Sequence, residues 1–167
     1  LVVTQQQVFN EFSGGTPDVA AVRNFARMLY KRNEGFRYLL LFGDGTYDNR
    51  NITGANANLL LTMQSEEAES TDNSYVSDDF FGMLDNGEGE FTGTLDIAVG
   101  RMPASNTGEA QAMVDKIRRH LTGRDPGGWC NTIAIIADDE ESGDFVNDAE
   151  GICNVIGQTS PEYNINK

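Results

Sequence analysis

The sequence has few of the residues that build metal and nucleophile sites. It contains two cysteines, Cys130 and Cys153, and one histidine, His120. Zinc sites need clusters of cysteine and histidine at close spacing, so the sequence excludes them. A Ser–His–Asp triad is also excluded. His120 follows two arginines at the end of a predicted helix, where a cation interacts favourably with the helix dipole. Both cysteines are predicted to be small buried residues, and a disulfide between them stays open.

Lysine and arginine are scarce. They number 12 against 26 aspartates and glutamates, which gives a net charge of −14. The phosphates of DNA or RNA would repel such a chain, so nucleic acids are excluded as partners. Between Arg50 and Arg101 the sequence has no base and ten acids. This segregation fits either a solvated acidic face or carboxylates that converge on a hard divalent cation, Ca²⁺ or Mg²⁺.

Long apolar runs are absent. The longest, Tyr38–Phe42 and Ile133–Ala137, have the length of strands and fall far short of the roughly 20 residues of a membrane span. No signal peptide opens the chain, and Leu1 is not an initiator methionine. We therefore expect a globular domain without a membrane span, taken from a longer protein.

Alternating helix and strand signals predict an α/β fold with a parallel sheet and right-handed crossovers. Thr16 is predicted to cap a helix whose first position is Pro17, and residues 33–35 are predicted to end it. The apolar run 36–42 is typical of a buried parallel strand. The remaining predicted elements are a hairpin of 80–84 with the strand 95–99, a helix over 107–121, a strand over 132–137 and a helix over 145–156. The glycine-rich stretch 123–128 separates two parts, 1–125 and 126–167.

Polar residues follow the predicted strands, at the sheet edge where open α/β folds bind ligands. Asp44 follows the first strand, the Gly100–Arg101 pair the second, and Asp138 with Asp139 the third. No phosphate-binding loop, dinucleotide fingerprint or EF-hand is present. A Mg²⁺-dependent phosphoryl-transfer site is disfavoured, because no lysine lies at a strand end. The residues alone predict an acidic α/β domain with a divalent-cation site, or a non-catalytic domain whose acidic face binds a basic partner.

Four segments, taken in order, resemble the gingipain-like cysteine peptidase family, and within it the sortase-like signal peptidase of the type IX secretion system. The segments are residues 6–18 (QQVFNEFSGGTPD), 38–49 (YLLLFGDGTYDN), 71–82 (TDNSYVSDDFFG) and 95–103 (LDIAVGRMP). The resemblance implies a parallel-sheet, caspase-like α/β fold built from two subdomains. Residues 1–125 would form the first subdomain of the catalytic domain, and 126–167 would begin the second.

The resemblance also implies a peptidase with a cysteine nucleophile and a histidine general base. In the family these residues lie on later strands, which places them beyond Lys167. His120 is not followed by glycine, and Cys130 and Cys153 lie in other segments, so no catalytic residue is assigned. The implied enzyme acts at the outer membrane on the cell surface, with other secretion-system components, and removes carboxy-terminal sorting signals from secreted cargo proteins. Residues 1–167 alone are expected to be inactive.

Structural Ca²⁺ is the cofactor that the resemblance implies. Asp44 and Asp96 match two ligand positions of the family, and Asp85 is the next choice. The alternative is that these aspartates are hydrogen-bonded structural carboxylates. Asp144 matches a loop that shapes the pocket for the substrate side chain, where an acid would favour a basic residue beside the scissile bond. Its alternative role is to cap the helix that follows.

Overall fold

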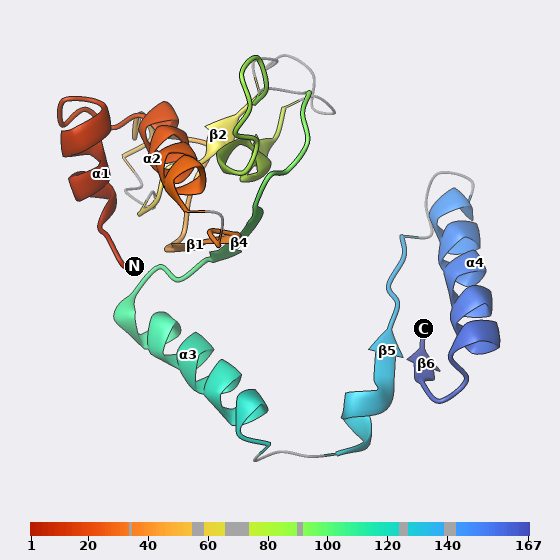
Figure 1. Ribbon diagram of the computed structural model, residues 1–167. Coiled ribbons are helices and arrows are strands. Elements are labelled where there is room, and N and C mark those ends of the chain that lie inside the picture. The colour runs from red at the N-terminus through yellow and green to blue at the C-terminus, as the bar shows by residue number, and fades with distance from the viewer. Residues whose placement is uncertain (34, 55–58, 66–73, 90–91, 124–126, 139–142) are drawn as a thin grey trace. The chain divides into compact units, whose positions relative to one another are not determined.

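The computed structural model describes residues 1–33, 35–54, 59–65, 74–89, 92–123, 127–138 and 143–167 (Figure 1). These residues form helices and short strands in alternation, with two parallel strand pairs. The α/β prediction is confirmed, and the arrangement is consistent with a caspase-like fold. The chain divides into two units, Leu1–Lys116 and Ile117–Lys167, and each is described by itself. The predicted boundary at 125/126 lies outside the described residues.

Two helices begin the first unit. α1, Gln5–Phe12, starts with a capping box in which Thr4 and Gln7 bond reciprocally. α2, Val19–Arg32, has Asp18 as its N-cap, and the Asp18 carboxylate accepts the N–H of Ala20. The predicted cap at Thr16 is wrong, because the chain supplies this better-placed carboxylate two residues later. The contact between the helices is apolar, with Val8, Phe9 and Ala21 buried among Phe12, Val22, Phe25 and Leu61.

The first parallel pair joins β1, Tyr38–Phe42, to β4, Ala98–Met102. β4 begins three residues later than predicted, because pairing starts where the Ala98 N–H donates to the Arg37 carbonyl. Arg101 therefore lies inside the strand rather than after it. α2 covers one face of this pair, where Ala26, Leu84 and Ile97 are buried among Phe36, Leu39 and Val99.

The side chains of β1 alternate in burial. Leu41 is buried, whereas Tyr38, Leu40 and Phe42 are exposed. Alternate residues of a strand point to opposite faces of a sheet, so only one face of β1 is covered. The prediction of a buried strand is therefore wrong for one of the two faces of β1 in this structure.

A short hairpin and a tight turn complete the first unit. β2, Met63–Gln64, pairs antiparallel with β3, Val76–Ser77, and η1, Asp79–Phe81, is one turn of 3₁₀ helix. The predicted strand over 80–84 is wrong, because Phe81 and Leu84 are both buried, and a spacing of three suits a helical turn better than strand alternation. Gly82 fits this turn tightly, since a Cβ there would lie 2.8 Å from side-chain carbons of Leu95 and Val99.

α3, Thr107–Leu121, has the predicted bounds and runs across the division between the units. In the second unit, β5, Thr132–Ala134, is followed by α4, Asp144–Thr159, and by β6, Asn164–Asn166. β5 and β6 pair in parallel, so this segment is a strand–helix–strand crossover. In the described ranges no helix is long and apolar enough to span a membrane.

The two cysteines are in different environments. Cys153 is buried in α4, as predicted, whereas Cys130 is exposed. Cys130 belongs to η2, Gly128–Asn131, a 3₁₀ turn without a buried side chain. Both are free thiols, so no disulfide joins them.

Candidate functional site

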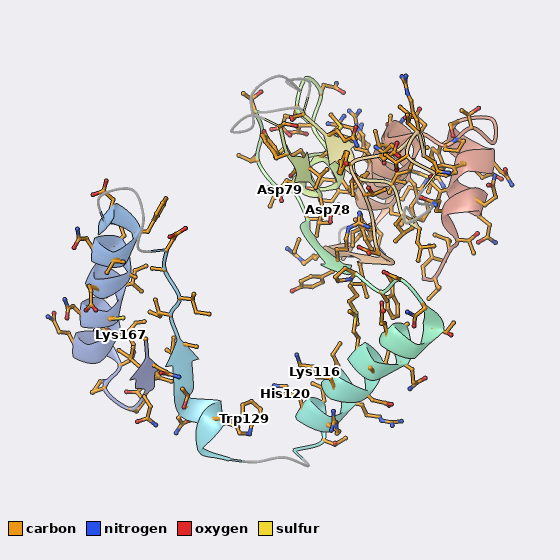
Figure 2. The ribbon with its side chains drawn as sticks, turned by 180° about the vertical axis from the view of Figure 1, so that it is seen from behind. Asp78, Asp79, Lys116, His120, Trp129 and Lys167 are labelled. Carbon is orange, nitrogen blue, oxygen red and sulfur yellow. The ribbon has the colours of Figure 1, made fainter. Side chains whose placement is uncertain are left out.

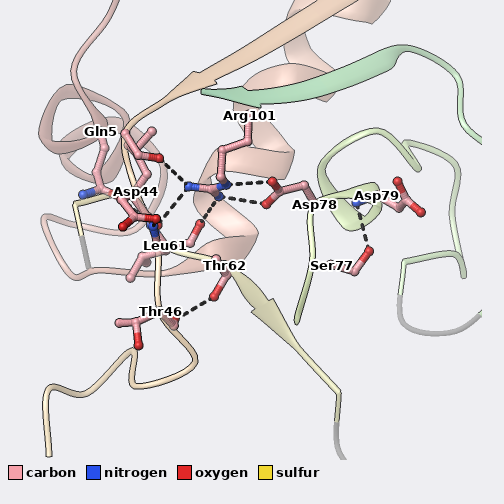
Figure 3. Close-up of polar contacts among 12 residues, drawn as sticks. Gln5, Asp44, Thr46, Leu61, Thr62, Ser77, Asp78, Asp79 and Arg101 are labelled. Atoms are coloured by element: carbon pink, nitrogen blue, oxygen red, sulfur yellow. Dashed lines mark hydrogen bonds and ion pairs between the residues drawn. The ribbon is translucent and has the colours of Figure 1, made fainter. Parts of the chain in front are cut away.

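Arg101 is the centre of the most extensive polar network in the described residues. Its Nε and Nη2 donate to the two carboxylate oxygens of Asp78 over 2.7 and 2.8 Å. Its Nη1 donates to the carbonyls of Gly43 and Leu60, and Nη2 donates to that of Leu61. Figure 3 shows the guanidinium between these groups. The Arg101 and Asp78 side chains are 13% and 24% exposed, so the pair is largely shielded from water.

This network joins three segments that lie far apart in the sequence. The guanidinium holds the turn after β1, the segment before β2 and the residue before η1 against β4. An arginine has five N–H donors, and these five hydrogen bonds use all three of its nitrogens. Arg101 therefore organises the carboxyl end of the sheet and is not placed as a free anion-binding group.

Asp44 lies at this same end of the sheet and is hydrogen-bonded. Its Oδ1 accepts the N–H of Gly45, and its Oδ2 accepts the hydroxyl of Ser105, each over 2.9 Å. Its carbonyl accepts the N–H groups of Leu59 and Leu60. The carboxylate thus ties the turn after β1 to the segment that precedes α3, which is what a structural aspartate does.

Asp96 and Asp85 lie at the opposite end of the pair. Asp96 precedes β4, and its Oδ2 accepts the N–H of Leu84 over 2.8 Å. The Asp85 carbonyl accepts a bond from Arg23, whose Nε also donates to the carbonyl of Met83. Burial lowers the pKa of the Arg23 guanidinium, Arg27 lowers it further, and the charges of Glu88 and Asp96 raise it. The Asp96 carboxylate therefore already interacts with the charge of a protein cation, Arg23.

Asp44 and Asp96 therefore cannot bind one ion in this structure. The five paired residues of β1 and β4 separate them, which at about 3.3 Å per residue is at least about 13 Å. Ca²⁺ holds its ligands at about 2.3–2.6 Å. In the described residues no three histidine, cysteine, aspartate or glutamate side chains are grouped to hold a metal. A single Ca²⁺ site shared by Asp44 and Asp96 does not fit this geometry. That either residue binds Ca²⁺ at a site of its own stays a prediction.

Asp144 is the first residue of α4 and is exposed. The N-cap is Gly143, which has a φ of 79°, and no side chain caps the helix. The interpretation of Asp144 as the cap is therefore wrong, although a carboxylate in the first turn still interacts favourably with the helix dipole. Its role in a substrate pocket stays a prediction, because residues 139–142 before it lie outside the described ranges. Asp139 is among them.

The histidine and the cysteines do not form a catalytic pair. The His120 ring lies beside the Trp129 indole (Figure 2). The two ring centroids are 6.0 Å apart. Among the described residues no hydrogen bond links His120 to Cys130 or Cys153, and Cys153 is buried. A cysteine nucleophile needs an adjacent base and access to substrate.

A small cavity of about 170 Å³ was not anticipated from the sequence. It lies between the β2–β3 hairpin and η1 and is lined by Met63, Gln64, Ser65, Tyr75, Ser77, Asp79, Phe80 and Met83. The Nε2 of Gln64 is buried and has no hydrogen-bond partner among the residues that the structure describes. No sequence signal marks this cavity, because its walls come from segments separated by residues 66–73.

The helices and the two parallel strand pairs of the described residues define an α/β fold, consistent with that of caspase-like peptidases. The model of peptidase family C25 matches residues 1–167, so the chain belongs to this family, the gingipain family of cysteine peptidases. No curated protein and no solved structure matches the chain.

Proposed function

We propose that residues 1–167 are the scaffold part of a peptidase that removes carboxy-terminal sorting signals from secreted proteins. The observation that carries this proposal is the family match over the whole chain, which assigns cysteine peptidase chemistry at family level. The finer assignment, to the signal peptidase of the type IX secretion system often called PorU, rests on the four segments that resemble it.

The proposal gives residues 1–167 a structural role in that reaction. The catalytic histidine and cysteine would be supplied by a part of the peptidase outside these residues, since His120, Cys130 and Cys153 are not arranged as a pair. Arg101 would fix the carboxyl end of the β1–β4 pair, the edge at which parallel α/β folds hold ligands. Protein substrates agree with the family. Action at the cell surface with other secretion-system components follows from the finer assignment.

Processing of cargo in the cell tests this function. In the organism that carries the gene, replacing Arg101 with methionine is expected to leave cargo proteins with their carboxy-terminal sorting domains uncleaved, as measured by mass spectrometry of the surface proteins. Lys167→Met is the matched control, because the ion pair of Lys167 with Glu150 is exposed. Normal cargo processing after deletion of the whole gene would refute the proposed substrate.

The purified chain provides a second test. We expect no hydrolysis of peptides that span a sorting-signal cleavage site, with or without a thiol reductant. Measurable hydrolysis that disappears in Cys130→Ala or Cys153→Ala would show that the nucleophile lies within residues 1–167. Catalysis by a thiolate without a neighbouring base would then need another source of activation.

Calcium binding is a separate part of the proposal, and the aspartate geometry gives it little support. Asp44 and Asp96 accept hydrogen bonds from the protein and lie at opposite ends of the sheet. What supports it is the acidic segment between Arg50 and Arg101, whose oxygens are of the kind that Ca²⁺ prefers. Ca²⁺ would act as a stabilising ligand of the folded chain.

A further inference from the structure

Asn86 and Gly87 form an exposed Asn-Gly step in the loop between η1 and β4. Gly87 has a φ of 83°, and a Cβ placed on it would meet nothing within 4 Å. Neighbouring residues hold the loop, since the Asp85 N–H donates to Glu88 and the Asp85 carbonyl accepts from Arg23. In the described part of the chain the Gly87 N–H makes no hydrogen bond, and the residue is exposed, so this nitrogen is not held by the protein.

The side-chain amide of Asn86 is bound by a cation. The Nη2 of Arg27, on α2, donates to the Oδ1 of Asn86. The Nε of the same arginine is buried and has no hydrogen-bond partner in the described residues. A guanidinium on a carbonyl oxygen polarises it and stabilises negative charge that develops there. The Nε–H of this guanidinium is therefore a buried donor that no protein group in the described residues uses.

We propose that Asn86 is a self-catalysed deamidation site at which Arg27 promotes the reaction and then binds the product. The backbone nitrogen of Gly87 attacks Cγ of Asn86, so that a bond from this nitrogen to Cγ forms. The bond from Cγ to Nδ2 breaks, and ammonia leaves with the proton of the Gly87 amide. Solvent water then opens the resulting ring and leaves a carboxylate at position 86 in a normal or an iso-aspartyl linkage. Nothing is oxidised or reduced.

The product fits the unused donor of Arg27. A carboxylate has two oxygens, and a guanidinium binds them side by side through Nε and one Nη. Deamidation thus replaces a single bond to a neutral amide with a charge-assisted pair, in which the buried Nε gains a partner. The modification would bind the loop more tightly to α2. The charges of Asp85 and Glu88 lie nearby and disfavour a further negative charge at position 86, whereas the charge of Arg23 favours it.

Peptide mapping by mass spectrometry tests the reaction. The folded chain, incubated in buffer at neutral pH, is expected to convert Asn86 faster than the same chain unfolded in urea. Replacing Arg27 with glutamine should slow conversion in the folded chain about tenfold, by loss of the donor that stabilises charge on Oδ1. Arg32→Gln is the matched control, because Arg32 lies exposed on the same helix and changes the net charge equally. An equal rate in Arg27→Gln and the control would overturn the proposal.

Thermal melting tests the product. Asn86→Asp reproduces the normal-linkage product without the reaction, and it is expected to raise the Tm by about 1–3 °C. The same substitution in an Arg27→Gln background should not raise it, because the gain comes from the new pair. A lower Tm for Asn86→Asp, or the same rise with and without Arg27, would contradict the binding of the product. A chain with no conversion after prolonged incubation would contradict the reaction itself.

Discussion

Arg101 provides the sharpest test of how this domain is held together. Replacing it with methionine keeps most of the aliphatic stem and removes every donor. The Asp78 carboxylate, 24% exposed, then loses its cation, and the carbonyls of Gly43, Leu60 and Leu61 each lose a bond. Removing one partner of a buried pair costs about 3–5 kcal/mol, and the partial exposure here reduces the expected loss to about 2–4 kcal/mol.

Hydrogen exchange locates this loss. The N–H of Leu60 donates to the Asp44 carbonyl, and that of Ser65 donates to the Tyr75 carbonyl. Both amides lie in segments that adjoin Arg101, and a loss of 2 kcal/mol should speed their exchange about 30-fold. Amides of α4 in the second unit should be unchanged. A protein of two units is not expected to unfold in one step, so local exchange is more informative here than a single midpoint.

The exposed ion pair of Lys167 with Glu150 is the matched control. Its atoms lie 2.6 Å apart, closer than those of Arg101 and Asp78, but both side chains are about half exposed. Lys167→Met should therefore leave the free energy of unfolding almost unchanged, because solvent screens an exposed pair. If Arg101→Met lowers the free energy of unfolding no more than this control does, then burial and the three carbonyl bonds do not make the Arg101–Asp78 pair important for stability. That result would refute the prediction.

Three further changes have defined outcomes. Gly82→Ala should destabilise the chain by about 1–3 kcal/mol in a urea titration, because its Cβ would overlap Leu95 and Val99, whereas Gly100→Ala, in open space, should not. The pKa of Asp48 is lowered by the hydrogen bonds from the N–H and hydroxyl of Thr53 and from the N–H of Ile52. These bonds therefore stabilise the fold fully above the pKa that Asp48 has in the unfolded chain, and the stabilisation is lost as the pH falls through its lower pKa in the folded chain. If NMR shows that Asp48 titrates at its ordinary pKa in the folded chain, this explanation is contradicted. Millimolar Ca²⁺ should raise the Tm and EDTA should reverse the rise; no response in metal-free protein would remove calcium from the proposal.

The elements with strong local signals were predictable. The apolar run of β1 and the periodicity and bounds of α3 needed no tertiary information. α1 carries a signal that was missed, since Thr4 and Gln7 have the spacing of a capping box in front of a mostly polar helix. The sequence pattern predicts that this strand begins at Leu95, because Leu95, Asp96 and Ile97 alternate as strand residues do. In the structure β4 begins at Ala98, since only the pairing with β1 determines where the hydrogen-bonded ladder starts. Register is a property of two strands and is not contained in one.

The candidate site was harder to predict for a related reason. Arg101 is conspicuous in the sequence, because the fifty residues between Arg50 and Arg101 contain no lysine or arginine. The sequence does not indicate which of the ten acids in this stretch forms an ion pair with it. Asp78 forms this ion pair because the β2–β3 hairpin and η1 place it at the carboxyl end of β4. The family resemblance predicts that Asp44 and Asp96 are both Ca²⁺ ligands. The parallel register of β1 and β4 places them at opposite ends of this strand pair.

The distribution of charge in the structure changes what the acidic stretch means. Its acids have no bases among their own sequence neighbours, which is why a divalent cation was an attractive prediction. In the fold, arginines from other elements take that place: Arg101 binds Asp78, and Arg23 lies by the loop that carries Asp85 and by the charge of Asp96. Each guanidinium also bonds to backbone carbonyls, which a side chain can do only once the segments are in place. The segregation along the sequence is therefore compensated across the fold at these points. A metal ion is not required to explain it.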